Sequence, residues 1–284
     1  MKIGRWEVDW VTDGTWYLDG GAMFGRVPRV LWERVAPPDG KNRVRLTCRV
    51  LVLRSDEACV LVDSGLGRAL PPKLAENVGV GPAWELPAAL QSLGVRTDAV
   101  DHVILSHLHF DHVGACIRRG ADGDLVPTFP NARHLIQRGE WADAFDDNVL
   151  LRRSYVTEML TPLEQAGIIE LVDGSRIGWS AEVLPGVHVE VTGGHSASHQ
   201  IVRVTDGTRT VAYLGDLLPL VPHVNPAWVL AFDAYPLDSV AGKQDLFARA
   251  EREGWLIVLD HDPEHACGRI VRDEEGQYTW RDAE

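Results

Sequence analysis

One stretch of the sequence decides its fold class: Ser106-His107-Leu108-His109-Phe110-Asp111-His112. It directly follows an apolar run at 100–105 that is typical of a buried strand. A chain that leaves a sheet edge there can curl around an ion, with two histidines directed at one metal and Asp111 and His112 at a neighbouring one. A solvated polar loop is the plainer alternative. With 11 histidines in 284 residues, however, chance gives this pattern about once in a thousand sequences.

Three more candidate ligands follow later apolar runs. His195 comes after 187–192 through two glycines, Asp216 comes after 210–214, and His261 comes after 255–259. A strand end is where a rigid sheet can aim a ligand from a short loop. One such histidine would be weak evidence, but three candidates beside the histidine-rich stretch predict a metal centre.

The remaining pattern predicts two halves, each with strands first and helices after. Strands are expected at 5–11 and 15–18 around an Asp13-Gly14 turn, and again at 43–53 and 58–63. Helices are expected at 84–93, 139–145, 154–166 and 243–253. Residues 20–38 form a long apolar loop, and no linker composition marks a boundary. We therefore expect one domain over residues 1–284, of class α+β, with two sheets back to back and helices outside.

Composition narrows the classes of function. The formal net charge of -13 and the lack of a lysine and arginine cluster argue against nucleic acid as a partner. No apolar run is long enough for a bilayer and the N-terminus lacks a signal-peptide pattern, so we expect a cytoplasmic protein with no membrane partner. The four cysteines form no C-x-x-C pair and are expected to be free thiols.

Together these motifs resemble the metallo-β-lactamase superfamily over nearly the whole chain. The resemblance rests on the histidine-rich stretch, Val62-Asp63-Ser64-Gly65, Gly193-Gly194-His195-Ser196 and Leu214-Gly215-Asp216. It implies a four-layer αββα sandwich with two metal ions at the sheet edges. Several stretches, Gly215-Asp216-Leu217-Leu218-Pro219 among them, are similar to bacterial N-acyl-homoserine-lactone lactonases.

The resemblance also implies a role for each ligand. His107, His109 and His195 are expected at the first metal, and Asp111, His112 and His261 at the second. Asp216 is expected to bridge the two ions, and Asp63 to orient a ligand imidazole from behind. The chain departs from the family's usual pattern after the third histidine, where it reads His195-Ser196-Ala197-Ser198-His199.

These assignments predict a dinuclear metal-dependent hydrolase that uses a metal-bridging hydroxide. Asp111 and Asp216 set the charge on the metal pair, and Asp111 can also guide the proton. Two divalent transition-metal ions are expected, with Zn²⁺ favoured and Mn²⁺ or Fe²⁺ as alternatives.

The substrate is predicted less directly. Lactones or carboxylic esters are the leading expectation, and organophosphates or phosphodiesters are the alternative. Some lactonases carry a tyrosine three residues after the bridging aspartate, where this chain has Pro219. His223 is the candidate replacement, with a loop histidine of no role as the alternative.

An apolar wall for an acyl chain is a further expectation. It would comprise Met23, Phe24, Trp32 and Phe110, whose alternative role is packing or dimer contact. A homodimer is therefore a possible assembly. A non-catalytic metal-binding protein is the remaining alternative, weakened because such a protein has no need of all seven ligands.

Overall fold

The computed structural model describes residues 1–81, 84–152, 154–174 and 176–283. The chain divides into two compact units, which are described separately. Unit 1 comprises Met1–Gly14 and Cys48–Arg176, and unit 2 comprises Thr15–Thr47 and Ile177–Glu284. The boundary falls inside two long strands, β2 (Trp6–Asp19) and β3 (Arg43–Arg54), so each of these strands contributes to both units.

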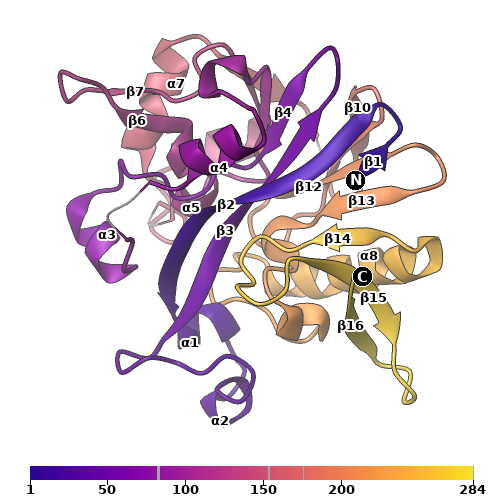
Figure 1. The fold of residues 1–284 in the computed structure, drawn as a ribbon. Coiled ribbons are helices and arrows are strands. Elements are labelled where there is room, and N and C mark those ends of the chain that lie inside the picture. Colours follow the sequence, from indigo (N-terminus) through magenta and orange to yellow (C-terminus); the bar gives the residue numbers. More distant parts are fainter. Residues whose placement is uncertain (82–83, 153, 175, 284) are drawn as a thin grey trace. The chain divides into compact units, whose positions relative to one another are not determined.

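The first sheet has seven strands in the order β1-β2-β3-β4-β5-β8-β9. Its long strands β2 and β3 are drawn in indigo and purple in Figure 1. Its four later strands run parallel to one another, which places their carboxyl ends at one edge. The further strands of this sheet are β1 (Lys2–Ile3), β4 (Cys59–Val62), β5 (His102–Ile104), β8 (Arg133–Gln137) and β9 (Ile169–Val172).

Short helices and a small hairpin complete unit 1. The hairpin pairs β6 (Ile117–Arg119) with β7 (Leu125–Pro127). The α-helices are α3 (Pro72–Asn77), α4 (Leu86–Ser92), α5 (Phe110–Val113), α6 (Arg138–Ala144) and α7 (Thr161–Gln165). Single 3₁₀ turns lie at η1 (Thr97–Ala99), η2 (Gly114–Cys116) and η3 (Thr157–Met159).

The second sheet lies in unit 2 and has seven strands in sequence order. All neighbours are antiparallel except β13 and β14, which are parallel because α8 (Pro236–Glu253) connects them. The strands are β10 (Ser180–Leu184), β11 (Val187–Val191), β12 (Gln200–Thr205), β13 (Thr210–Tyr213), β14 (Leu256–Val258), β15 (Cys267–Arg272) and β16 (Tyr278–Asp282). Unit 2 also contains α1 (Gly20–Phe24), α2 (Arg29–Trp32), η4 (Gly215–Leu217) and η5 (Val221–Val224).

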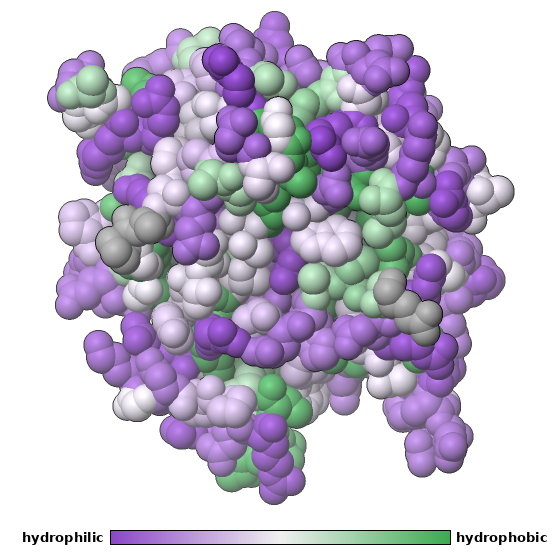
Figure 2. All heavy atoms as spheres, viewed as in Figure 1, coloured by the Kyte–Doolittle hydropathy of each residue, from purple (hydrophilic) through white to green (hydrophobic). Residues whose placement is uncertain are grey.

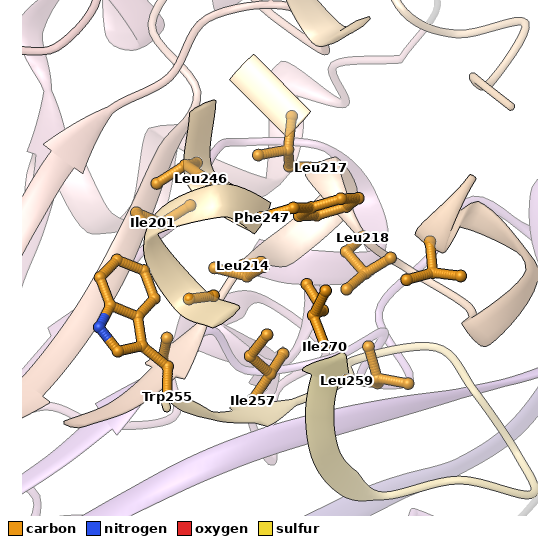
Figure 3. Packing of buried hydrophobic residues seen from close by; sticks show 13 residues of the cluster. Ile201, Leu214, Leu217, Leu218, Leu246, Phe247, Trp255, Ile257, Leu259 and Ile270 are labelled. Carbon is orange, nitrogen blue, oxygen red and sulfur yellow. The ribbon is translucent and has the colours of Figure 1, made fainter. Parts of the chain in front are cut away.

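Helix α8 holds this sheet in place through an apolar stripe. Leu246, Phe247 and Ala250 of α8 pack against apolar side chains of β12 to β15 (Figure 3). The helix ends at Gly254, which adopts φ +63° and lets the chain turn back into β14. This packing fixes the ends of β13 and β14, from which Asp216 and His261 follow.

Some sequence predictions of secondary structure are wrong. The expected turn at Asp13-Gly14 is instead the middle of one continuous strand, β2. The Asp13 carboxylate accepts the backbone N–H groups of Gly67 and Leu86 at 2.7 and 3.3 Å, so it anchors neighbouring segments rather than reversing the chain. The helix expected at 154–166 is broken into η3 and α7, because Pro162 occupies the first turn of α7.

The surface seen in Figure 2 is mostly hydrophilic, with hydrophobic residues in small scattered groups. One exposed apolar group lies on and beside α2, where Val30, Leu31 and Val35 are 60%, 45% and 53% exposed. Within the described residues, no helix combines the length and apolar character needed to cross a membrane.

Replacing Phe247 with alanine should destabilise unit 2 by about 3–5 kcal/mol, because it leaves a cavity under the sheet. The matched control is Leu237→Ala on the same helix, whose side chain is 80% exposed and should cost well under 1 kcal/mol. Urea unfolding of both variants measures the difference. Equal losses would contradict the packing described here.

Candidate metal centre

The histidine-rich stretch in unit 1 leads from the end of β5 into the short helix α5, which contains Asp111 and His112. His107, His109, Asp111 and His112 are all buried. The His107 ring centroid lies 4.5 Å from that of His109 and 4.0 Å from that of His112. The sequence prediction that these side chains gather at a strand end therefore agrees with the local structure.

Asp63 holds this stretch from behind. It follows β4 with φ +57°, a left-handed conformation that aspartate tolerates better than most residues. Its carboxylate accepts the Ser106 backbone N–H and hydroxyl, each at 2.7 Å, and lies 2.8 Å from His112 Nδ1. A carboxylate in this place fixes the ring so that Nε2 faces outward as a ligand atom.

Glu140 and Tyr155 also support the stretch, and the sequence analysis gave them no role. Glu140 Oε1 accepts the Leu108 backbone N–H at 3.1 Å and the Tyr155 hydroxyl at 2.7 Å. The Tyr155 ring lies 5.1 Å from the ring of His109. Spacing along the chain carries no signal for these contacts, because Glu140 lies 32 residues after the backbone group that it binds.

Three strand ends of unit 2 bring His195, Asp216 and His261 together. Asp216 Oδ2 lies 3.0 Å from His195 Nε2, and Asp216 Oδ1 lies 3.2 Å from His261 Nε2. The approach to His195 requires Gly194, because a Cβ there would lie 2.5 Å from Ser239 Oγ at a φ of +86°. All three side chains are buried.

In both His195 and His261, the ring nitrogen Nδ1, which points away from Asp216, lies next to a hydrogen-bond acceptor. His195 Nδ1 lies 2.9 Å from Asp233 Oδ1, and His261 Nδ1 lies 2.8 Å from the Thr47 carbonyl oxygen. A carbonyl oxygen only accepts, so His261 carries a proton on Nδ1, and Nε2 is the atom that faces Asp216. The sequence gave no signal for Asp233, which lies in a loop 38 residues after His195.

Asp260 extends the unit 2 cluster and was also missed. Asp216, Asp260 and His261 each offer a ligand atom within 4.8 Å of the others. Asp260 Oδ1 accepts the backbone N–H of His261 at 2.9 Å, so Asp260 also shapes the turn that presents this histidine.

The donor set of unit 2 fits a divalent metal ion. Imidazole nitrogens that face carboxylate oxygens at 3.0 and 3.2 Å need a cation beside them, either a proton or a metal ion, because two lone pairs would repel each other. Neutral imidazole and carboxylate are the ligands that Zn²⁺, Mn²⁺ and Fe²⁺ share. His199 is held differently, with Nδ1 2.7 Å from Thr192 Oγ1.

His223 lies in η5 of unit 2 and packs in the interior, whereas the sequence offered either a substrate-polarising role or a loop histidine of no role. Its ring is fully buried and stacks on Phe24 at 5.2 Å, and its Nε2 lies 3.0 Å from the Met23 carbonyl oxygen. Burial, with the nearby charge of Lys243, lowers the pKa of His223 to about 3. A neutral imidazole of this kind is a poor proton donor near pH 7.

The four residues expected to form an apolar wall differ in how deeply they are buried. Met23, Phe24 and Trp32 are at most 2% exposed, and Phe24 stacks on Trp32 at 5.2 Å within unit 2. Phe110 begins α5 in unit 1 and is only half-buried. The first three therefore pack in the interior, and Phe110 alone of this set offers substantial surface.

Comparison with known proteins identifies one family to which this chain is similar. The model of the metallo-beta-lactamase superfamily matches residues 43–117. A probable metallo-hydrolase of Mycobacterium tuberculosis is 30% identical over 251 residues, 78% of this chain and 76% of that protein. N-acyl homoserine lactonase AttM of Azorhizobium caulinodans is 28% identical over 185 residues, 62% of this chain. The match spans 64% of that lactonase, less than two thirds of its length.

A solved structure extends the similarity to the full chain. A probable metal-dependent hydrolase from Staphylococcus aureus aligns over 100% of both chains with a TM-score of 0.86 and 25% identity. The predicted α+β fold class is thereby confirmed.

Replacing Asp233 with alanine should weaken metal binding about 10–100-fold, because His195 loses the acceptor that orients its ring. Asp233→Asn keeps a hydrogen-bond acceptor but loses the negative charge, so its metal affinity should lie between those of Asp233→Ala and the wild type. Asp245→Ala, a 72% exposed carboxylate of the same unit, is the control. Competition with a chromophoric chelator measures the affinities, and equal affinity in all four proteins would remove Asp233 from the site.

Replacing His223 with phenylalanine tests the packing role through pH. A buried histidine with a lowered pKa stays neutral while the unfolded chain takes up a proton, so its contribution to stability is lost as pH falls from 6.5 towards 3. His223→Phe should reduce the slope of the unfolding free energy in this window by about 1.4 kcal/mol per pH unit. An unchanged slope in urea titrations would contradict the buried, neutral histidine.

Proposed function

Because this chain belongs to the metallo-β-lactamase superfamily, we propose that it is a dinuclear metal-dependent hydrolase acting on lactones or carboxylic esters. One observation carries the proposal. Both oxygens of the Asp216 carboxylate face imidazole Nε2 atoms, of His195 and His261, whose Nδ1 atoms are held by acceptors. Such an arrangement is costly in a buried place unless it binds a cation.

We retain the ligand assignment that the family resemblance implies, and the single domain that the sequence predicts, as parts of this proposal. His107, His109 and His195 would hold one ion, and Asp111, His112 and His261 the other. Asp216 would bridge the ions, since it has one oxygen for each. Asp63 supports this assignment by its contact with His112, as Asp233 does by its contact with His195.

Two divalent ions would supply Lewis acidity and a water activated near neutral pH. Zn²⁺ is the proposed metal, because five histidine nitrogens favour it over Mn²⁺ and Fe²⁺. The side chains of the protein then have defined tasks. Asp111, buried beside His112 at 3.7 Å, is the proposed carrier of the proton to the leaving oxygen.

The remaining site residues would orient these groups. Glu140 would hold the backbone between His107 and His109 by accepting the Leu108 N–H. The same carboxylate accepts the Tyr155 hydroxyl, and the Tyr155 ring contacts the ring of His109. His223 would shape the site by packing on Phe24 instead of donating a proton. Phe110 is the side chain of the predicted apolar wall that we propose contacts the substrate.

The substrate class rests on the curated relatives. AttM is named an N-acyl homoserine lactonase, and its match to this chain is the reason to place lactones first. The family's two-metal chemistry serves phosphoesters as well, so organophosphate hydrolysis is the alternative that a direct comparison must separate.

A panel of γ-lactones with short and long acyl chains, aryl esters, phosphotriesters and bis-aryl phosphodiesters tests the substrate. Wild-type protein should give its highest kcat/KM on a lactone or ester. Asp216→Ala should lower kcat/KM on that substrate by about 10³-fold, because the variant lacks the group proposed to hold both ions. Asp245→Ala should match the wild type. Inert lactones and esters with turnover of phosphotriesters would overturn the substrate class. A metal-loaded protein that turns over nothing would indicate the non-catalytic alternative.

A further inference from the structure

A cavity in unit 1 is lined by three arginines and a tryptophan, none of which belongs to the metal centre. Arg68, Trp84, Arg118 and Arg119 enclose about 230 Å³. No carboxylate is among these lining residues. Guanidinium groups collected around a cavity create a local positive potential, even in a chain whose net charge is -13.

Two of these arginines lack acidic partners. Within the described residues, Arg118 and Arg119 form no ion pair, and Arg119 donates only to the Gly123 carbonyl oxygen at 3.3 Å. Arg68 lies 3.9 Å from a carboxylate oxygen of Asp13. Elsewhere in unit 1, by contrast, Arg96 and Arg138 are each paired with an aspartate. Arg118 and Arg119 are exposed and have no acidic partner in the described part of the chain, so both cations are available to an anion.

Arg118 also lines a second cavity, of about 380 Å³, beside α4. We call the two cavities together, which share Arg118, the arginine groove; its lining also includes Trp84 before α4, Gln91 on that helix and Thr128 after β7. Arg118 stands on β6, opposite Val126 of β7, so the hairpin holds its backbone in place. The one acidic side chain in the second cavity, Asp98, is paired with Arg96.

Thr128 gives an independent indication of a ligand. It is 2% exposed, and its hydroxyl has no hydrogen-bond partner in the described part of the chain. Buried hydroxyls are almost always hydrogen-bonded, because leaving one unsatisfied costs its lost hydration. Thr128 lines the second cavity, so a ligand oxygen that reached its hydroxyl would supply the missing partner.

We propose that the arginine groove binds a small organic molecule through an oxyanion, either a carboxylate or a phosphate. Guanidinium binds both groups with paired N–H···O hydrogen bonds, which explains why arginine rather than lysine lines the groove. The Trp84 ring offers an apolar surface beside the charged end, which fits an organic anion better than an inorganic one. The proposal does not depend on the hydrolase activity.

Isothermal titration of the metal-loaded protein with phenyl phosphate and with benzoate tests this site. These probes share a ring and differ in the oxyanion, so the tighter binder identifies the group. Arg118→Gln should weaken binding of the preferred probe about tenfold or more, since a charge-assisted hydrogen bond is lost. Thr128→Val should weaken binding of the same probe several-fold. The control is Arg138→Gln, which removes an exposed arginine paired with Asp173 and should leave the affinity unchanged. Added salt should weaken binding in the wild type.

Two outcomes would overturn the proposal. One is the absence of binding of either probe at millimolar concentration. The other is binding that Arg118→Gln and Thr128→Val both leave unchanged, which would place the anion elsewhere, as at the metal centre. Arg118 is exposed, so its variant is expected to fold, and circular dichroism checks this.

Discussion

The contact of Asp216 with two histidines is the constraint on which the proposed chemistry depends. One of its oxygens faces His195 Nε2 and the other faces His261 Nε2, in a buried place. Three strands of one sheet deliver these side chains, and α8 packs on that sheet through Leu246 and Phe247. The apolar core of unit 2 thus fixes the positions of groups that would otherwise repel one another.

The histidine rings of the candidate metal centre are held in fixed orientations, which favours metal binding. The Thr47 carbonyl oxygen, Asp233 and Asp63 each lie against a histidine Nδ1, so the ligand nitrogens face inward before any ion arrives. Preorganisation lowers the cost of binding, because little side-chain freedom remains to be lost. An ion that binds only the folded chain would in turn stabilise the fold. Metal binding and stability are therefore expected to be linked in this protein.

The sequence indicated the strand-end positions of the candidate ligands more directly than the residues that support them. His195, Asp216 and His261 follow strands directly, and that local pattern survives in the structure. Asp233 and Glu140 act on residues 38 and 32 positions away, a relation that a single sequence does not encode in any spacing. Asp13 shows the same limit, because its buried contacts with Gly67 and Leu86 turn an apparent hairpin signal into a strand interior. Hydrophobicity alone also failed to separate buried Phe24 from half-buried Phe110.

Anomalous diffraction from zinc-loaded crystals, with data on both sides of the zinc absorption edge, tests the central claim most directly. The account predicts two peaks per chain, roughly 3.5–4 Å apart, with one oxygen of Asp216 next to each. His195 Nε2 should lie beside one peak and His261 Nε2 beside the other. A single peak, or two peaks of which Asp216 touches only one, would contradict a bridging carboxylate and the dinuclear hydrolase built on it.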